Sequence, residues 1–196
     1  MKITGNTILI TGGGSGIGRA LAESLYARGN HVIITGRRDA PLQAVAAAHP
    51  DMAWATLDMT DPAAIRAFAA QVVRDHPALN VVVNNAGIMQ SEDLTAEPFS
   101  LETAETTVAT NLLGPIRLTM ALLPHLRSRP ASTVMTVTSG LAFIPLVATP
   151  TYNATKAAIH SWTQSLRTQL ADTSVEVLEL APPAVATRLM ARHAQN

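Results

Sequence analysis

A glycine-rich segment near the N-terminus constrains the fold of this chain more than any other feature. Residues 7–11 (Thr-Ile-Leu-Ile-Thr) are typical of a buried β-strand, and residues 19–28 carry apolar side chains at helical spacing. Between them, residues 12–18 include five glycines. Glycines in such a turn allow positive φ angles and let a helix pack closely on a strand. The segment therefore predicts a strand–turn–helix unit at the start of the fold.

Strand and helix patterns alternate along the rest of the chain. Apolar, β-branched runs predict further strands at residues 31–35, 52–57, 81–83, 133–138 and 175–180. Helical patterns cover residues 41–48, 61–75, 102–127 and 152–171. The second of these helices begins with Asp61 as N-cap and Pro62 at the first helical position. This order predicts an α/β doubly wound parallel sheet, the three-layer αβα Rossmann fold, with six strands and all 196 residues in one domain.

The composition excludes several functional classes. Charged residues make up 14% of the chain and the formal net charge is zero, so there is no electrostatic basis for binding nucleic acid or an anionic membrane. No cysteine is present, which excludes disulfides, thiolate catalysis and zinc–thiolate sites, and we predict no metal site. The N-terminal residues lack the pattern of a signal peptide, and the longest apolar runs have only the length of strands. We therefore predict a cytoplasmic protein.

Polar residues follow the predicted strands, at the edge of the sheet where open α/β folds bind their ligands. Gly12, Gly16 and Gly18 lie at the first such end. Their Gly-x-x-x-Gly-x-Gly spacing differs from the commoner Gly-x-Gly-x-x-Gly dinucleotide motif. Because the backbone there can approach a pyrophosphate at the start of the following helix, the segment predicts a dinucleotide site. The alternative is a tight turn that binds no ligand.

Arg37 indicates the type of cofactor. An acidic residue at the end of the second strand would bind the ribose 2′-hydroxyl of NAD, whereas an arginine suits the 2′-phosphate of NADP. Here Gly36 is followed by Arg37 and Arg38, and no carboxylate occurs before Asp39. A guanidinium binds a phosphate through two parallel hydrogen bonds. The sequence therefore favours NADP over NAD, the alternative being two arginines that are only exposed loop residues.

Tyr152 and Lys156 are four residues apart on a predicted helix, so their side chains share one face. A neighbouring ammonium favours the phenolate and is expected to lower the pKa of Tyr152. A tyrosine tuned in this way can exchange a proton with a hydroxyl or carbonyl oxygen. Taken alone, the spacing is also that of an ordinary pair on a helix surface.

Several of these segments together resemble the short-chain dehydrogenase/reductase family. The resemblance covers almost the whole chain and rests on residues 11–18 (Thr-Gly-Gly-Gly-Ser-Gly-Ile-Gly), 84–87 (Asn-Asn-Ala-Gly), Asn111, Ser139 and Tyr152-x-x-x-Lys156. The gap of thirteen residues between Ser139 and Tyr152 is also similar to that of the family. Within it, residues 149–156 and 179–183 are most similar to oxidoreductases of the DltE type. The resemblance implies hydride transfer between NADP(H) and a carbonyl or alcohol substrate.

The resemblance also implies roles for individual residues. Tyr152 is the expected general acid/base, Lys156 lowers its pKa and binds the nicotinamide ribose, Ser139 polarises the substrate oxygen, and Asn111 holds a water that links Lys156 to solvent. The expected cofactor-binding residues are Gly12, Ser15, Gly16, Ile17, Gly18, Arg37, Asp58, Met59, Asn85, Ala86, Gly87, Tyr152, Lys156, Pro182, Val185 and Thr187. Without that context, Ser139, Asn111 and Asp58 would be ordinary capping or turn residues.

The sequence departs from the family pattern near its C-terminus. Pro182 is followed by Pro183 where the family usually has glycine, and residues 187–196 can supply only the start of the usual substrate-covering segment. We therefore expect no seventh strand and no lid, which leaves residues 175–180 at a sheet edge. The alternative function is an NADP-binding module with weak or no catalysis. A sugar-nucleotide epimerase is disfavoured, because those enzymes normally have another glycine spacing and a larger C-terminal domain.

The resemblance implies a homodimer or homotetramer built on the helices around Asn111 and Tyr152. The substrate itself cannot be identified from the sequence. Residues 88–94 and 141–147 are expected to line its pocket, and they are apolar enough to suggest that part of the substrate is hydrophobic.

Overall fold

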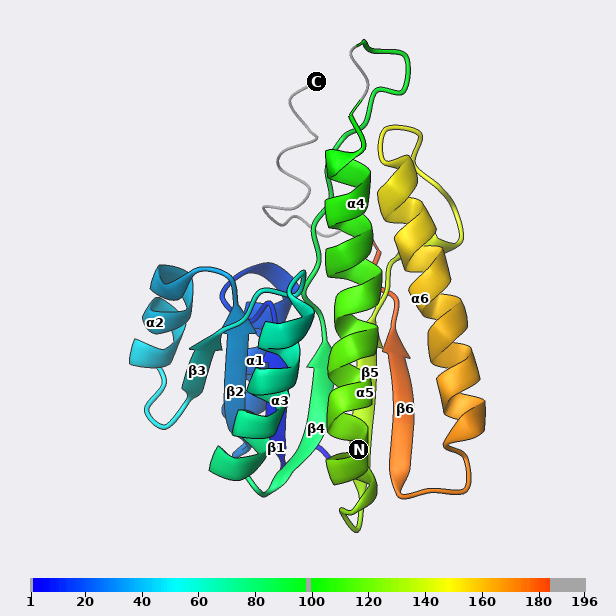
Figure 1. Ribbon diagram of the computed structural model, residues 1–196. Coiled ribbons are helices and arrows are strands. Elements are labelled where there is room, and N and C mark those ends of the chain that lie inside the picture. Colours follow the sequence, from blue (N-terminus) through cyan, green and yellow to red (C-terminus); the bar gives the residue numbers. More distant parts are fainter. Residues whose placement is uncertain (1, 98–99, 184–196) are drawn as a thin grey trace.

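Six parallel strands form one twisted sheet in the order β3-β2-β1-β4-β5-β6 (Figure 1). The computed structural model describes residues 2–97 and 100–183. The strands are β1 (Thr7–Thr11), β2 (His31–Gly36), β3 (Ala53–Thr56), β4 (Leu79–Asn84), β5 (Ser132–Val137) and β6 (Val175–Leu180). The order reverses between β1 and β4, so a crevice opens there at the carboxyl ends of the strands. The predicted doubly wound α/β fold is confirmed.

Helices connect the strands and cover both faces of the sheet. They are α1 (Gly16–Tyr26), α2 (Asp39–Ala47), α3 (Pro62–Asp75), α4 (Glu102–Val108), α5 (Gly114–Arg127) and α6 (Pro150–Gln169). A short 3₁₀-helix, η2 (Gly140–Ala142), follows β5. The predicted N-cap of α3 is confirmed, since the Asp61 carboxylate accepts hydrogen bonds from the amides of Ala63 (2.7 Å) and Ala64 (3.0 Å). These bonds lower the pKa of Asp61.

The long helix predicted over residues 102–127 is present but contains a π-helical turn. This turn, η1 (Ala109–Leu113), joins α4 to α5. In a regular α-helix the amide of residue 115 would donate to the main-chain carbonyl of Asn111. Residue 115 is proline and has no N–H, so the regular pattern fails at this carbonyl. The widened turn therefore occurs at a predicted site residue.

Two hydrophobic clusters hold the layers together. One contains Leu9, Val82 and Val134 from the sheet and packs against α3, α5 and α6, which lie on one side of the sheet in Figure 1. The other contains Ile8, Ile10 and Ile34 and packs against α1 and α2. Because successive strand residues point to opposite faces, Leu9 and its neighbours Ile8 and Ile10 belong to different clusters. This alternation fixes the register in which Thr7 pairs with His31 and Thr11 pairs with Thr35.

β6 is an edge strand of the described sheet, as predicted. It pairs with β5 over its full length, from Ser132 with Val175 to Val137 with Leu180, and its other side has no partner strand among residues 2–97 and 100–183. In the same part of the chain, no helix is long and apolar enough to cross a lipid bilayer.

Candidate active site

The glycine turn is packed so tightly that side chains are sterically excluded from it. Gly12 has a φ of 71°, and a Cβ placed there would lie 2.9 Å from Asn85 Nδ2. A Cβ at Gly18 would lie 2.3 Å from Asn85 Nδ2 and 2.4 Å from the Gly12 carbonyl oxygen. The glycines therefore bring the start of α1 directly against the end of β1, as the sequence predicts.

A cleft of about 150 Å³ lies beside this turn, at the reversal of strand order. It contains six of the predicted cofactor-binding residues, namely Gly12, Ser15, Arg37, Met59, Ala86 and Gly87. The remaining lining residues include Arg38, Ile88 and Thr110. Asp58 lies outside this cleft, in a larger neighbouring groove that shares Arg37 and Leu57 with it. The Asp58 carboxylate accepts hydrogen bonds from the amide and hydroxyl of Thr60, both at 2.8 Å.

The chemistry of the cleft fits a phosphorylated dinucleotide. Ser15 is the N-cap of α1, no side-chain hydrogen bond caps the helix, and its first turn holds no acidic residue. The amides of Gly16, Ile17 and Gly18, in this first turn, lie where a helix can bind an anion. Within the described residues, no hydrogen bond or ion pair engages the Arg37 guanidinium. The buried hydroxyl of Thr110 also lacks a partner there. We did not predict Thr110, which directly precedes Asn111.

Asn85 ties the two strands that flank the crevice. Its side-chain amide donates to the main-chain oxygen of Thr11 at 2.9 Å. In return, the Thr11 hydroxyl accepts from the amides of Asn85 and Ala86, each at 3.0 Å. These bonds join the ends of β1 and β4, whereas the Asn85 side chain is not among the groups that line the cleft.

Tyr152, Ser139 and Lys156 come together from α6 and the end of β5. Tyr152 is 5% exposed, and the Ser139 side chain is close enough to act on the pKa of its hydroxyl. Lys156 Nζ lies 5.6 Å from the centre of the Tyr152 ring and donates to the main-chain oxygen of Val137 at 2.9 Å. Ser139 Oγ also accepts from the amide of Leu141 at 3.1 Å, which fixes the hydroxyl at the start of η2.

The predicted net fall in the pKa of Tyr152 is wrong for this geometry. Burial raises the pKa of Tyr152, and the nearby Ser139 side chain opposes that rise. Two features explain the difference: Lys156 Nζ is turned toward Val137, and burial lowers the pKa of Lys156 itself to about 8. The four-residue spacing predicted that the two residues share a face of the helix. It did not indicate the free-energy cost of burying both side chains.

Asn111 contacts the main chain of the loop after β4 through both ends of its side-chain amide. Oδ1 accepts from the amide of Ile88 and Nδ2 donates to its carbonyl, each at 2.8 Å. A Cβ at Gly87 would lie 3.4 Å from Asn111 Oδ1 and 3.8 Å from Lys156 Nζ. The absence of a side chain at Gly87 thus leaves space between these two groups.

Glu92 is a residue near the site that the sequence did not reveal. It lies in the loop after β4, and its carboxylate accepts from the amide of Thr151 at 3.0 Å and from the Thr151 hydroxyl at 2.6 Å. These contacts hold the first turn of α6, one residue before Tyr152. Fifty-nine residues separate the two partners, so no local pattern could have indicated the pair.

Of the predicted residues after β6, only Pro182 lies within the described chain. Its main-chain oxygen accepts from the amide of Gly140 at 3.1 Å, next to Ser139. Val185 and Thr187 lie outside the described residues.

The fold, the glycine turn and the Ser139–Tyr152–Lys156 cluster define a class of oxidoreductase, and comparison with known proteins gives the same class. The chain belongs to the short chain dehydrogenase family, whose model matches residues 6–196. It is 44% identical over 189 residues to the uncharacterized oxidoreductase DltE of Bacillus subtilis (strain 168), covering 96% of this chain and 75% of that protein.

Solved structures agree with this assignment. A short-chain dehydrogenase from Streptomyces avermitilis is 36% identical, with a TM-score of 0.86 over 94% of this chain and 68% of the other. The 3-oxoacyl (acyl-carrier-protein) reductase from Agrobacterium tumefaciens, solved with NADP bound, is 28% identical. Its TM-score is 0.87 over 99% of this chain and 76% of that chain.

Lys156 is expected to reduce the stability of the protein at neutral pH. Its pKa is lowered to about 8 from 10.5, so the unfolded chain binds more protons between these values and stability rises with pH across that window. The full effect is about 3 kcal/mol. Lys156→Met removes the buried charge and loses the bond to Val137, so we expect a net gain of about 1–2 kcal/mol at pH 7. Denaturant unfolding at pH 7 and pH 10 measures the free energy of unfolding of both proteins. A variant less stable than wild type at pH 7 contradicts the predicted gain.

Proposed function

We propose that this protein is an NADP(H)-dependent reductase of carbonyl compounds, which also oxidises the corresponding alcohols. The observation that carries the proposal is the grouping of Ser139, the buried Tyr152 and the buried Lys156 close to a cleft suited to a dinucleotide. When bound, NADPH supplies a hydride to the carbonyl carbon. The side chains of this chain orient the substrate and supply the proton.

The direction of the Tyr152 pKa supports the reductive direction. A buried tyrosine whose pKa is raised remains protonated at neutral pH, as a general acid must. In the proposed step, Ser139 donates a hydrogen bond to the substrate oxygen and Tyr152 gives its phenolic proton to the forming alkoxide. The Lys156 ammonium, charged below about pH 8, then stabilises the phenolate left on Tyr152 and binds the ribose hydroxyls.

Proton resupply is proposed to pass between Lys156 and Asn111. The space at Gly87 lies between Lys156 Nζ and Asn111 Oδ1 and suits a bridging water. The side-chain amide of Asn111 is already bonded to Ile88, so this water would use a remaining lone pair of Oδ1 or the main-chain carbonyl. Pro115 cannot donate to that carbonyl.

The remaining site predictions belong to the same proposal. Gly12, Ser15, Gly16, Ile17 and Gly18 bind the pyrophosphate, and Arg37 binds the 2′-phosphate. Asp58 and Met59 contact the adenine, while Asn85, Ala86 and Gly87 position its ribose. Pro182, Val185 and Thr187 hold the nicotinamide. Residues 1–196 act as one cofactor-binding catalytic domain, and the protein works in the cytoplasm as a homodimer or homotetramer.

The substrate is proposed to be at least partly apolar. Residues 141–147 follow Ser139, and four apolar side chains of this segment, at Phe143, Ile144, Leu146 and Val147, are exposed. Leu94, in the loop after β4, is exposed as well. An apolar surface at the entrance to a catalytic cluster favours substrates with hydrocarbon or aromatic groups.

Replacing Arg37 by alanine is expected to weaken NADPH binding by tenfold or more, on the order of the loss of one charge-assisted contact to the 2′-phosphate. NADH has no such phosphate, so its dissociation constant should change by less than about twofold. Titration of cofactor fluorescence with both dinucleotides measures this difference. Arg38→Ala is the matched control. Equal losses for NADPH and NADH in Arg37→Ala would show that Arg37 does not bind a 2′-phosphate.

The proposed reaction is tested by following deuterium. Wild-type protein is incubated with deuterated NADPH, labelled at C4 of the nicotinamide, and with hexanal, cyclohexanone or 4-nitrobenzaldehyde as carbonyl probe. We expect deuterium on the carbinol carbon of at least one product, detected by mass spectrometry. NADPH binding without any transfer to these probes would instead support the alternative, a cofactor-binding module.

A further inference from the structure

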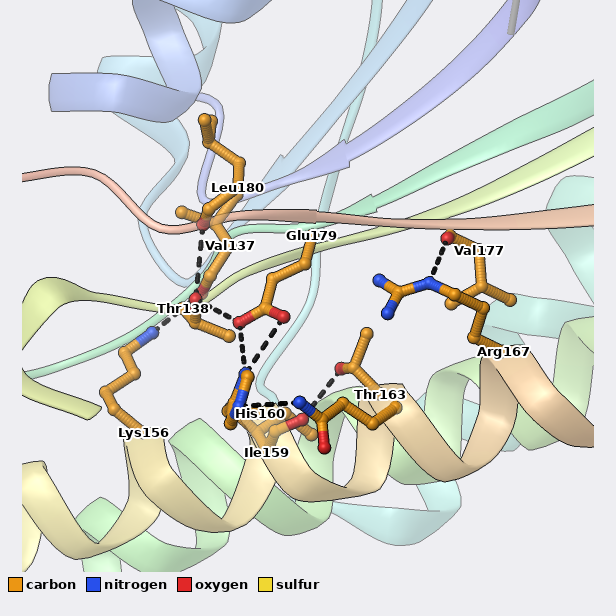
Figure 2. Close-up of polar contacts among 11 residues, drawn as sticks. Val137, Thr138, Lys156, Ile159, His160, Thr163, Arg167, Val177, Glu179 and Leu180 are labelled. Atoms are coloured by element: carbon orange, nitrogen blue, oxygen red, sulfur yellow. Dashed lines mark hydrogen bonds and ion pairs between the residues drawn. The ribbon is translucent and has the colours of Figure 1, made fainter. Parts of the chain in front are cut away.

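A partly buried polar cluster lies where α6 packs on β6, and the proposed reaction does not use it directly (Figure 2). Val175, Val177 and Glu179 occupy alternate positions of β6 and therefore share one face of the sheet. Both valines belong to the hydrophobic cluster under α6. Glu179 continues this row with a carboxylate whose side chain is only 13% exposed. Burying an apolar residue there would cost less free energy, because a buried charge destabilises the protein unless it is well paired.

The Glu179 carboxylate joins three segments. Its Oε1 accepts from the Thr138 hydroxyl at 2.7 Å. His160 Nδ1, from α6, lies 2.8 and 2.9 Å from the two carboxylate oxygens. On its other side, His160 Nε2 lies 2.9 Å from Gln164 Nε2. If the Gln164 amide donates there, the imidazole carries its proton on Nδ1 and directs it at Glu179.

This cluster is linked to Ser139 through the backbone on either side of that residue. The amide of Thr138 donates to Leu180 at 2.8 Å, and the amide of Gly140 donates to Pro182 at 3.1 Å. The Thr138 hydroxyl donates to the carboxylate of Glu179, which lies on β6 next to Leu180. The Thr138 hydroxyl also lies 3.4 Å from the Leu180 oxygen. Ser139 is thus the middle residue of a segment bonded to β6 and to Pro182 just after it, and in these contacts Glu179 contributes the only side chain from β6.

The cluster is also connected, along α6, to the other two members of the proposed site. His160 follows Lys156 by one helical turn and Tyr152 by two, so the three side chains form one row on the helix. The Phe143 ring also packs edge-on against the His160 ring, with 4.8 Å between their centres. His160 therefore connects α6, β6 and the segment after Ser139.

We propose that Glu179 and His160 are positioning residues that hold Ser139 in register with Tyr152, through Thr138. The proposal rests on the proposed function, in which Ser139 orients the substrate oxygen. Since misplacing a reacting group by about 1 Å can cost up to a hundredfold in rate, loss of the carboxylate should lower turnover more than cofactor affinity.

The variants for the test are Glu179→Val, which keeps the strand and removes the carboxylate, and Glu179→Gln, which restores one acceptor. Arg167→Gln is the matched control. Arg167 also ties α6 to β6, through a 3.0 Å bond from Nε to the Val177 oxygen, but lies two helical turns beyond His160 (Figure 2). The Tm of each variant is also measured, so that a specific effect can be separated from a general loss of stability.

Hydrogen exchange of residues 138–142 is the first measurement, because it needs no turnover. We expect exchange in this segment to become about tenfold faster in Glu179→Val and to return toward wild type in Glu179→Gln, with little change in Arg167→Gln. Unchanged exchange in Glu179→Val, or an equal change in Arg167→Gln, overturns the proposal. This outcome is independent of whether the wild-type protein reduces any carbonyl probe.

Turnover with NADPH and 4-nitrobenzaldehyde is the second measurement. We expect kcat to fall by about tenfold or more in Glu179→Val, with KM for NADPH within about twofold of wild type and partial recovery of kcat in Glu179→Gln. Equal loss of kcat in Arg167→Gln would assign the effect to helix docking and overturn the positioning role. If the wild-type protein shows no turnover, the proposed function is contradicted. The hydrogen-exchange result then tests the positioning role by itself.

Discussion

Tyr152→Phe is expected to reduce carbonyl turnover by about a thousandfold, within the range that general acid–base catalysis supplies. Phenylalanine keeps the ring that is buried beside Lys156 but has no phenolic proton for the alkoxide. Without the Tyr152 hydroxyl, Ser139 alone is left to bind the substrate oxygen. Steady-state rates of NADPH oxidation with 4-nitrobenzaldehyde measure the loss.

The control for this variant is cofactor binding. Tyr152 is only one of many proposed contacts to NADPH, so the dissociation constant of NADPH should stay within about threefold in Tyr152→Phe. Tyr26→Phe, at the last residue of α1, is a matched substitution, since among residues 2–97 and 100–183 the hydroxyl of Tyr26 bonds only the Pro50 oxygen. Equal turnover of Tyr152→Phe and wild type would exclude Tyr152 as the proton donor.

Gly18→Ala is expected to destabilise the whole protein by about 3 kcal/mol or more and to abolish cofactor binding. The added methyl group would lie 2.4 Å from the Gly12 oxygen and 2.3 Å from Asn85 Nδ2. Both neighbours are fixed, because Asn85 ties β4 to β1 through Thr11. The helix cannot retreat without opening the turn that would bind the pyrophosphate. Chemical denaturation and cofactor titration measure the two effects.

Gly36→Ala provides the matched control for stability. Gly36 ends β2 without a positive φ, and a Cβ there would meet only Leu42, at 3.6 Å or more. This variant should unfold within about 1 kcal/mol of wild type. If Gly18→Ala were as stable as Gly36→Ala, close packing of α1 on β1 would not explain the glycine at position 18.

Local physical rules were enough to predict most of the fold. Apolar runs predicted all six strands to within a few residues, and the signal is clearest for β1, β2, β4 and β5, which are largely buried on both faces. Asp61 and Pro62 gave the start of α3 directly. The cleft residues Gly12, Arg37 and Gly87 could be predicted because each follows a strand, and parallel strands all end at one edge of the sheet.

Features that depend on distant partners could not be predicted in this way. Glu92 and Thr151, like Glu179 and His160, are brought together only by the completed fold. The pKa of Tyr152 depends on its burial in the completed fold, which a helical spacing does not report. The π-helical turn at Asn111 had a local signal that we did not use, the proline four residues later.

The burial of Lys156 couples the binding of the cofactor to the protonation of this side chain. With a pKa of about 8, this ammonium is only partly charged near that pH. A ligand that offers it hydroxyl oxygens and nearby phosphates favours the charged form, so binding takes up protons from solution. By reciprocity, protons strengthen the binding of that ligand. We therefore expect the protein to bind NADP(H) more tightly below about pH 8 and more weakly above it.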